Sequence, residues 1–175
     1  MSENVALSIH NVTKKFGGLV AVDRMNFDIR EHEVFGIIGP NGSGKTTMLN
    51  LISGMLKRSS GRVKLYGKDI SGRSANRIAR HGVARTFQLV RTLPTMTVGE
   101  NIAAGGVFGY RRYWNEDLDR RVNYMVSQVG LAGKEMMPVG ALTYIDQKRV
   151  ELARALMSDP KLLLLDEWLA GLNPT

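Results

Sequence analysis

Apolar and polar residues alternate in three stretches of the first half of the chain, at Leu7–Val12, Phe27–Ile29 and Arg62–Tyr66. A period of two places the apolar side chains on one face, so each stretch predicts a half-buried strand. Val34–Ile38 is instead a short, continuous apolar run that leads directly into a glycine-rich turn. This pattern is typical of a strand buried on both faces of a parallel sheet.

Apolar residues recur at helical spacing in much of the remaining chain. Helices are therefore predicted at Thr46–Met55, Val98–Ala104, Leu118–Val129 and Asp146–Met157. Asp159-Pro160 ends the last helix, because the residue before a proline avoids helical backbone. Lys161–Asp166 then returns to a buried strand with four leucines. This order predicts an α/β core with a helical insertion between the strand of the glycine-rich turn and the leucine strand.

Length and composition narrow the class of protein. A chain of 175 residues suffices for one domain with a proper core. The absence of cysteine excludes a disulfide framework and a thiolate metal site. The N-terminal residues lack the apolar region of a signal peptide, and every apolar run is far shorter than the ~20 residues of a membrane span. Any membrane role is therefore expected to be peripheral, through a partner.

The chain has a basic excess, with a formal net charge of +8. Nucleotide phosphates, nucleic acid or an anionic membrane surface would suit this charge, and so would an ordinary solvated surface. The basic residues are scattered along the chain instead of gathered in one tail, which disfavours nucleic acid.

The glycine-rich turn carries the most specific motif. Residues 39–46 match G-x-x-x-x-G-K-[ST] at every fixed position, between a predicted strand and a predicted helix. The glycines let backbone N–H groups surround an anion at the helix N-terminus. Lys45 is expected to reach the β- and γ-phosphates of a nucleotide, and the Thr46 hydroxyl to bind Mg²⁺. A glycine-rich turn with an exposed lysine is the alternative. The predicted nucleotide-binding residues are Gly39, Pro40, Asn41, Gly42, Ser43, Gly44, Lys45, Thr46 and Thr47.

Two acids follow the leucine strand, at the sheet edge where ligands bind in open α/β folds. Asp166 suits a partner of Mg²⁺, directly or through water, and Glu167 suits a base that polarises the attacking water. A strand that ends in a solvated turn is the alternative, which the phosphate-loop motif makes less attractive.

Further segments resemble those of ABC ATPases. Gly82–Gln88 is similar to their glutamine loop, and Lys15-Phe16-Gly17 to the stretch that places an aromatic ring against adenine. Leu142–Leu156 aligns with the signature segment, L-S-G-G-Q or L-S-Y-G-x-Q, and with its helix. Thr97–Ile102 and Ala170–Thr175 are similar to branched-chain amino-acid uptake ATPases. The resemblance therefore covers nearly the whole chain.

The resemblance implies a role for each segment. Gln88 would contact Mg²⁺ and the attacking water while sensing a transmembrane partner, and it would join Lys45 and Glu167 as a catalytic residue. Phe16 would stack on adenine, with an ordinary core phenylalanine as the alternative. The signature residues, which would face the ATP of an opposite subunit, are Thr143, Tyr144 and Ile145.

The chain departs from the family pattern in two places. Ile145 replaces a glycine whose backbone approaches the γ-phosphate, and Trp168 stands where the family usually has proline. A β-branched residue resists positive φ and blocks close approach of the backbone. The ATP site that this segment would complete in the opposite subunit is therefore expected to be weak. The alternative is a backbone that still reaches its place with adjusted geometry.

The resemblance implies a P-loop NTPase core of RecA-like type, with an antiparallel β subdomain and an inserted helical subdomain. Residues 1–88 and 159–175 would form the nucleotide-binding core with the β subdomain, and residues 89–158 the helical subdomain. The family also places a histidine beyond Glu167, whereas all three histidines here lie upstream. We therefore expect a C-terminally truncated fragment or a degenerate copy, with unpaired backbone beside Val34–Ile38 and Leu162–Asp166.

The expected function is that of an ABC transporter ATPase subunit, which couples ATP binding and hydrolysis, with Mg²⁺, to import of branched-chain amino acids. The implied partners are a second ATPase subunit in a homo- or heterodimer, permease subunits and, indirectly, a periplasmic or extracellular solute-binding protein. The expected place is the cytoplasmic face of the inner or plasma membrane, with no nucleic acid as partner. A non-catalytic nucleotide-binding module and a soluble ABC ATPase that acts on nucleic acid or ribosomes are the alternatives.

Overall fold

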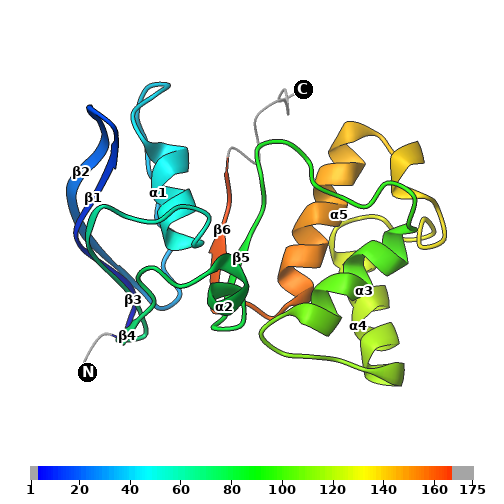
Figure 1. Cartoon of the computed structure of the whole chain (residues 1–175). Helices are drawn as coiled ribbons and strands as arrows, with labels where there is room; N and C mark the ends of the chain where they lie inside the picture. Colours follow the sequence, from blue (N-terminus) through cyan, green and yellow to red (C-terminus); the bar gives the residue numbers. More distant parts are fainter. Residues whose placement is uncertain (1–3, 167–175) are drawn as a thin grey trace. The chain divides into compact units, whose positions relative to one another are not determined.

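The computed structural model describes residues 4–166. The chain divides into two compact units, Met1–Ile78 and Ala79–Thr175. An antiparallel sheet and the helix α1 form most of the first unit, and three longer helices with a pair of parallel strands form the second (Figure 1). Helices and parallel strands together agree with the predicted α/β class.

The sheet of the first unit has the order β2-β1-β3-β4. Its strands are β1 (Val5–Phe16), β2 (Leu19–Arg30), β3 (Ser60–Leu65) and β4 (Lys68–Asp69). In β1, Leu7 and Ile9 lie opposite Leu65 and Val63 of β3, and all four side chains are buried. The period-two pattern therefore predicted the core face of this sheet correctly. The three predicted strands overlap β1, β2 and β3, whereas β4 was not predicted.

Helix α1 (Lys45–Ile52) begins directly after the glycine-rich turn. Its buried residues, Met48, Leu51 and Ile52, share one face because they are three and four positions apart. The short helix α2 (Ala75–Ala79) follows the sheet and buries Ile78. Sequence patterns predicted α1 and did not indicate α2.

The second unit is built on α3 (Val98–Phe108), α4 (Asn115–Gln128) and α5 (Tyr144–Met157), with a single 3₁₀ turn, η1 (Val139–Ala141), before α5. The three helices match the three predicted by helical spacing, each extended at one or both ends. Their buried apolar cluster comprises Val98, Ile102, Val122, Val126, Leu131, Val139, Leu142, Val150, Ala153 and Met157.

A short parallel sheet pairs β5 (Val83–Arg85) with β6 (Leu162–Leu164). The predicted leucine strand is therefore confirmed, but only Leu164 is fully buried, and Leu165 is exposed. A strand with a single paired neighbour leaves its other edge uncovered, which accounts for the partial burial. The pairing brings the glutamine-loop segment beside the acidic strand end, with Arg85 opposite Leu164.

The predicted strand at Val34–Ile38 is wrong. Residues 33–40 have no regular secondary structure, and Val34 and Ile38 are 100% and 95% exposed. A buried parallel strand needs paired neighbours, and none of the strands within residues 4–166 pairs with this segment. The Phe35 ring instead stacks on Phe27 of β2, with 5.0 Å between ring centroids. Apolar composition alone did not produce a strand here.

Candidate functional site

The last loop position of the phosphate-loop motif has a backbone conformation that favours glycine. Gly44 caps α1 in the left-handed region, at φ 91°. A Cβ atom at this position would also overlap the carbonyl oxygen of Ala21 in β2. Gly42 has φ 81°, but a Cβ there would meet open space. Gly44 is therefore fixed twice, by backbone conformation and by close approach to the sheet.

Lys45 folds back over its own loop. Its Nζ donates to the carbonyl oxygens of Gly39 at 2.7 Å and Pro40 at 2.9 Å. The first turn of α1, which lies within the described part, contains no acidic side chain and has no side-chain cap. Its N–H groups and dipole therefore favour an incoming anion. Lys45 therefore contacts its own loop, an arrangement that fits both a phosphate-binding loop and the alternative of a glycine-rich turn with an exposed lysine.

Phe16 lies at the end of β1, where it pairs with Leu19 of β2. The residue is 44% exposed, and Lys14 Nζ lies 4.6 Å from the centroid of its ring. The alternative of a core phenylalanine is therefore wrong for this ring. Ala21, which Gly44 approaches, is two residues from Leu19, or about 7 Å along the strand. The hairpin thus brings the Phe16 end of the sheet near the phosphate loop.

Asp166 is buried, in contrast to the alternative of a solvated turn. Its Oδ2 accepts from Arg85 Nη2 at 2.8 Å, and the two side chains are only 5% and 6% exposed. The adjacent β5–β6 pairing holds this ion pair in place, and Thr86 N–H donates to Leu164 across it. Arg85 was not singled out from the sequence. Glu167, Trp168 and the loop at Ala170–Thr175 lie outside the described residues.

Gln88 follows β5 in an irregular segment that α5 holds through its main chain. The Gln88 carbonyl oxygen lies 3.5 Å from the Tyr144 hydroxyl. Glu151 accepts from the Arg91 N–H at 3.3 Å, and Arg154 donates to the Arg91 carbonyl oxygen. Burial raises the pKa of Glu151, against the lowering effect of these N–H groups and of nearby cations. Glu151 and Arg154 were missed; an acid between the apolar Val150 and Leu152 was the available signal.

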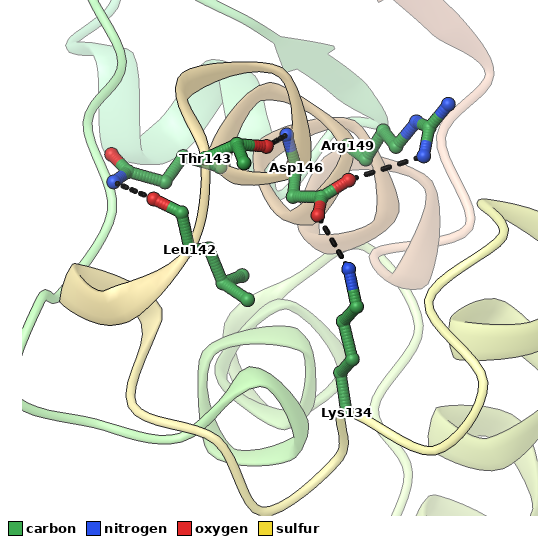
Figure 2. Close-up of polar contacts among 6 residues, drawn as sticks. Lys134, Leu142, Thr143, Asp146 and Arg149 are labelled. Carbon is green, nitrogen blue, oxygen red and sulfur yellow. Dashed lines mark hydrogen bonds and ion pairs between the residues drawn. The ribbon is translucent and has the colours of Figure 1, made fainter.

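The signature segment begins α5 (Figure 2). Thr143 is the N-cap, and its Oγ1 accepts from the Asp146 N–H at 3.2 Å. The Asp146 carboxylate in turn accepts from Lys134 at 2.6 Å and Arg149 at 3.1 Å. The hydrogen bond from Lys134 is the main cause that lowers the pKa of Asp146. Gln147 completes the turn by donating to the Leu142 carbonyl oxygen at 3.1 Å.

Ile145 occupies the second position of α5 and has ordinary helical backbone. The expected strain of a β-branched residue at positive φ is therefore not present. Tyr144 and Ile145 are both exposed at the helix start. Their N–H groups belong to the first turn, where backbone donors have no acceptor inside the helix. The segment thus offers an exposed helix N-terminus, with isoleucine bulk beside it.

The predicted residues therefore fall into two groups. Phe16 and the phosphate loop belong to the first unit, whereas Gln88, Asp166 and the signature segment belong to the second. Within residues 4–166, no three carboxylate or histidine side chains gather as a ready-made metal site. In the same range, none of the helices is long and apolar enough to cross a membrane.

Comparison with known proteins identifies the family. The ABC transporter family matches residues 22–170. The branched-chain amino acid transport ATP-binding protein LivG of Escherichia coli K12 is 38% identical over 182 aligned positions, which cover 96% of this chain and 71% of LivG. BraF of Pseudomonas aeruginosa, which has the same description, is 37% identical with the same coverage.

Solved structures agree with this match. The ADP conformation of MJ1267, an ATP-binding cassette of an ABC transporter, has a TM-score of 0.86 and 34% identity, over 97% of this chain and 71% of that one. The cbiO1 subunit from Clostridium perfringens, part of an ABC transporter complex, has a TM-score of 0.85 and 28% identity, over 98% and 69%. Sequence, fold and phosphate loop agree: the chain belongs to the ABC transporter family and is of its ATP-binding, ATPase type.

Proposed function

We propose that this chain binds ATP with Mg²⁺ and hydrolyses it to drive the import of branched-chain amino acids. The phosphate loop carries the proposal: a left-handed Gly44 at the sheet, an uncapped α1 and Lys45 above the loop together form an anion site. The amino acid comes from the relatives LivG and BraF, whose names describe transport of that class. An ATPase subunit does not itself select the solute, so this part rests on similarity.

Nucleotide recognition would use both ends of the first unit's site. The N–H groups of residues 39–47 would surround the phosphates, and Lys45 would exchange its two loop carbonyls for β- and γ-phosphate oxygens. The exposed Phe16 ring would stack on adenine. Charge at one end and an aromatic face at the other suit a nucleotide better than inorganic phosphate.

The donors at the proposed metal positions fit Mg²⁺. The Thr46 hydroxyl, the Asp166 carboxylate and the Gln88 side-chain amide all offer the oxygen ligands that Mg²⁺ prefers. Mg²⁺ commonly uses one or two protein ligands beside phosphates and water, so a cluster of acids is not required. When bound, the metal would neutralise phosphate charge. The Asp166–Arg85 ion pair, in which both side chains are buried, holds the carboxylate in a fixed position.

Catalysis would need water held in line with the γ-phosphate. Glu167 would accept a proton from that water, and Gln88 would orient it. Lys45 would stabilise the developing charge on the phosphoryl oxygens. The contacts between α5 and the Gln88 segment support an ordered position for Gln88.

Assembly would complete the site. Thr143, Tyr144 and Ile145 would face the ATP of a second ATPase subunit, where the exposed start of α5 offers N–H groups to phosphate. The helical backbone of Ile145 favours this function over that of a non-catalytic module. We further propose permease subunits as membrane partners, a solute-binding protein as an indirect one, and the cytoplasmic membrane face as the location. Residues 1–88 with 159–175 would be the nucleotide-binding core, and 89–158 the helical subdomain.

A nucleotide titration of the full chain tests the proposal. A fluorescent ATP analogue is expected to bind with Mg²⁺ and to lose at least tenfold in affinity in Lys45→Ala, because the phosphates lose a charge-assisted donor. Lys68→Ala, in exposed β4, is the matched control and should bind as the wild type does. Equal binding by Lys45→Ala and Lys68→Ala would contradict the proposed site. Release of inorganic phosphate then reports hydrolysis.

A further inference from the structure

Side chains of helix α5 contact the main chain of the segment around Gln88, and these contacts belong to none of the sequence motifs described above. Glu151 is only 1% exposed, and its Oε1 accepts from the Arg91 N–H at 3.3 Å. The backbone of Phe87 also faces this carboxyl and contributes to lowering its pKa, against the larger raising effect of burial. Phe87 and Arg91 are the ends of a five-residue segment that we name the Gln88 loop, and Glu151 holds the Arg91 end by a hydrogen bond.

Two further side chains of α5 contact the same loop. Arg154 donates to the Arg91 carbonyl oxygen, and the Tyr144 hydroxyl lies 3.5 Å from the Gln88 carbonyl oxygen. Positions 144, 151 and 154 are seven and three residues apart, so they share one face of the helix. All these contacts reach main-chain atoms. They therefore fix where the Gln88 loop lies without depending on its side chains.

Aromatic and cationic side chains extend this arrangement to Asp166. The Phe87 ring has the Arg91 guanidinium at 4.4 Å from its centroid and the Arg85 guanidinium at 5.0 Å. Arg85 is the ion-pair partner of Asp166. The Gln88 loop is thus linked on one side to α5 and on the other to the proposed metal ligand.

Burying Glu151 and Arg154 has a cost that packing alone does not explain. Burial disfavours both charges, raising the pKa of Glu151 and lowering that of Arg154. Within residues 4–166, the second oxygen of the Glu151 carboxylate is buried without a hydrogen-bond partner, and an unpaired buried polar atom costs free energy. A role in placing the Gln88 loop therefore explains these two residues better than a role in stability.

We propose that Glu151 and Arg154 are positioning residues that hold Gln88 in place for ATP hydrolysis, and so connect the signature helix to the Gln88 loop. The inference rests on the proposed function, in which Gln88 orients the attacking water. The two residues would act through Gln88 without contacting nucleotide themselves. Their loss should therefore lower the turnover of ATP and leave its binding nearly unchanged.

Steady-state hydrolysis by the full chain tests this separation. Glu151→Ala is expected to lower kcat about tenfold, with nucleotide affinity within about twofold of the wild type, since an unpositioned catalytic group costs rate rather than binding. Glu151→Gln retains an acceptor oxygen and should recover much of the rate. The neighbouring Val150→Ala, buried in the helical cluster, is the matched control for lost stability and should retain the wild-type kcat.

A double-mutant cycle separates positioning from a general structural effect. In a Gln88→Ala background, Glu151→Ala should cause no further loss of kcat, because the residue through which it acts is already absent. Losses that multiply in the double variant would overturn the proposal. So would a kcat for Glu151→Ala equal to that of the wild type.

Hydrogen exchange tests the anchoring without turnover. The amide of Arg91 should exchange at least tenfold faster in Glu151→Ala than in the wild type, and Val150→Ala should not show this selective change. Unchanged exchange at the Arg91 amide would overturn the inference even where hydrolysis is normal. Absence of ATP binding or hydrolysis in the wild type would instead contradict the proposed function. The two failures are therefore distinguishable.

Discussion

The phosphate loop and the Gln88 loop are held in different ways. The phosphate loop is shaped by its own residues: Gly44 supplies the left-handed turn, and Lys45 bonds to carbonyls five and six residues before it. The Gln88 loop contains no glycine and is held from outside, by Glu151 and Arg154, which are about sixty residues further along the chain. A locally encoded loop is visible as a sequence motif, whereas a loop held at long range is not. The difference predicts which substitutions damage each loop.

The largest effect is expected from breaking the long-range ion pair. Arg85→Met leaves the buried Asp166 carboxylate without its cation, which should lower the free energy of unfolding by about 3–5 kcal/mol. Chemical denaturation measures this loss. Adding Asp166→Leu should recover a large part of it, because an apolar pair replaces the charged one. A loss below about 1 kcal/mol in Arg85→Met would show that the pair is solvated and does not fix Asp166.

Substitutions at two glycines test the phosphate loop, which is shaped by its own residues. Gly44→Ala combines positive φ with overlap at the Ala21 carbonyl and should cost about 2–4 kcal/mol in stability. Gly42→Ala has similar φ but open space, so only the conformational cost of about 1–2 kcal/mol is expected. Denaturation curves of the two variants give the difference. Equal losses would mean that the sheet does not constrain the loop.

The sequence predicted elements whose information is local. Alternation predicted β1, β2 and β3, helical spacing predicted α1, α3, α4 and α5, and the glycine pattern predicted the loop before α1. Val34–Ile38 failed because a buried strand depends on partners, and its own residues do not determine whether these are present. Arg85, Glu151 and Arg154 were missed for the same reason. Their contacts join segments that only the fold brings together.

The signature helix offers a smaller, local test. Thr143→Ala removes the acceptor of the Asp146 N–H and should cost about 1 kcal/mol of stability. Thr143→Ser retains the hydroxyl and should lie within a few tenths of a kcal/mol of the wild type. Thermal unfolding monitored by circular dichroism compares the two. Equal melting temperatures for Thr143→Ala and Thr143→Ser would show that the cap adds nothing to α5.

The smallest expected effect is a difference in pH dependence between two acids of α5. Asp146 has a lowered pKa, chiefly from the Lys134 hydrogen bond and also from the Arg149 charge, so it stabilises the fold above its unfolded pKa near 3.8. That contribution is lost as the pH falls through the lower folded pKa. Burial raises the pKa of Glu151 despite the nearby Lys148 and Arg154, so its contribution is present below its unfolded pKa of about 4.5 and is lost as the pH rises through the folded value.

The two amide variants should therefore have opposite slopes when their stability is compared with that of the wild type. Asp146→Asn should be less stable than the wild type near pH 6, and this difference should shrink as the pH falls toward 3 (roughly the interval around an ordinary carboxyl pKa). Glu151→Gln should instead gain relative stability as the pH rises through about 4.5 and above. Urea unfolding at a series of pH values measures both differences. Parallel slopes would mean that Glu151 is solvated like an exposed acid, which would remove the physical basis for its selective hold on the Gln88 loop.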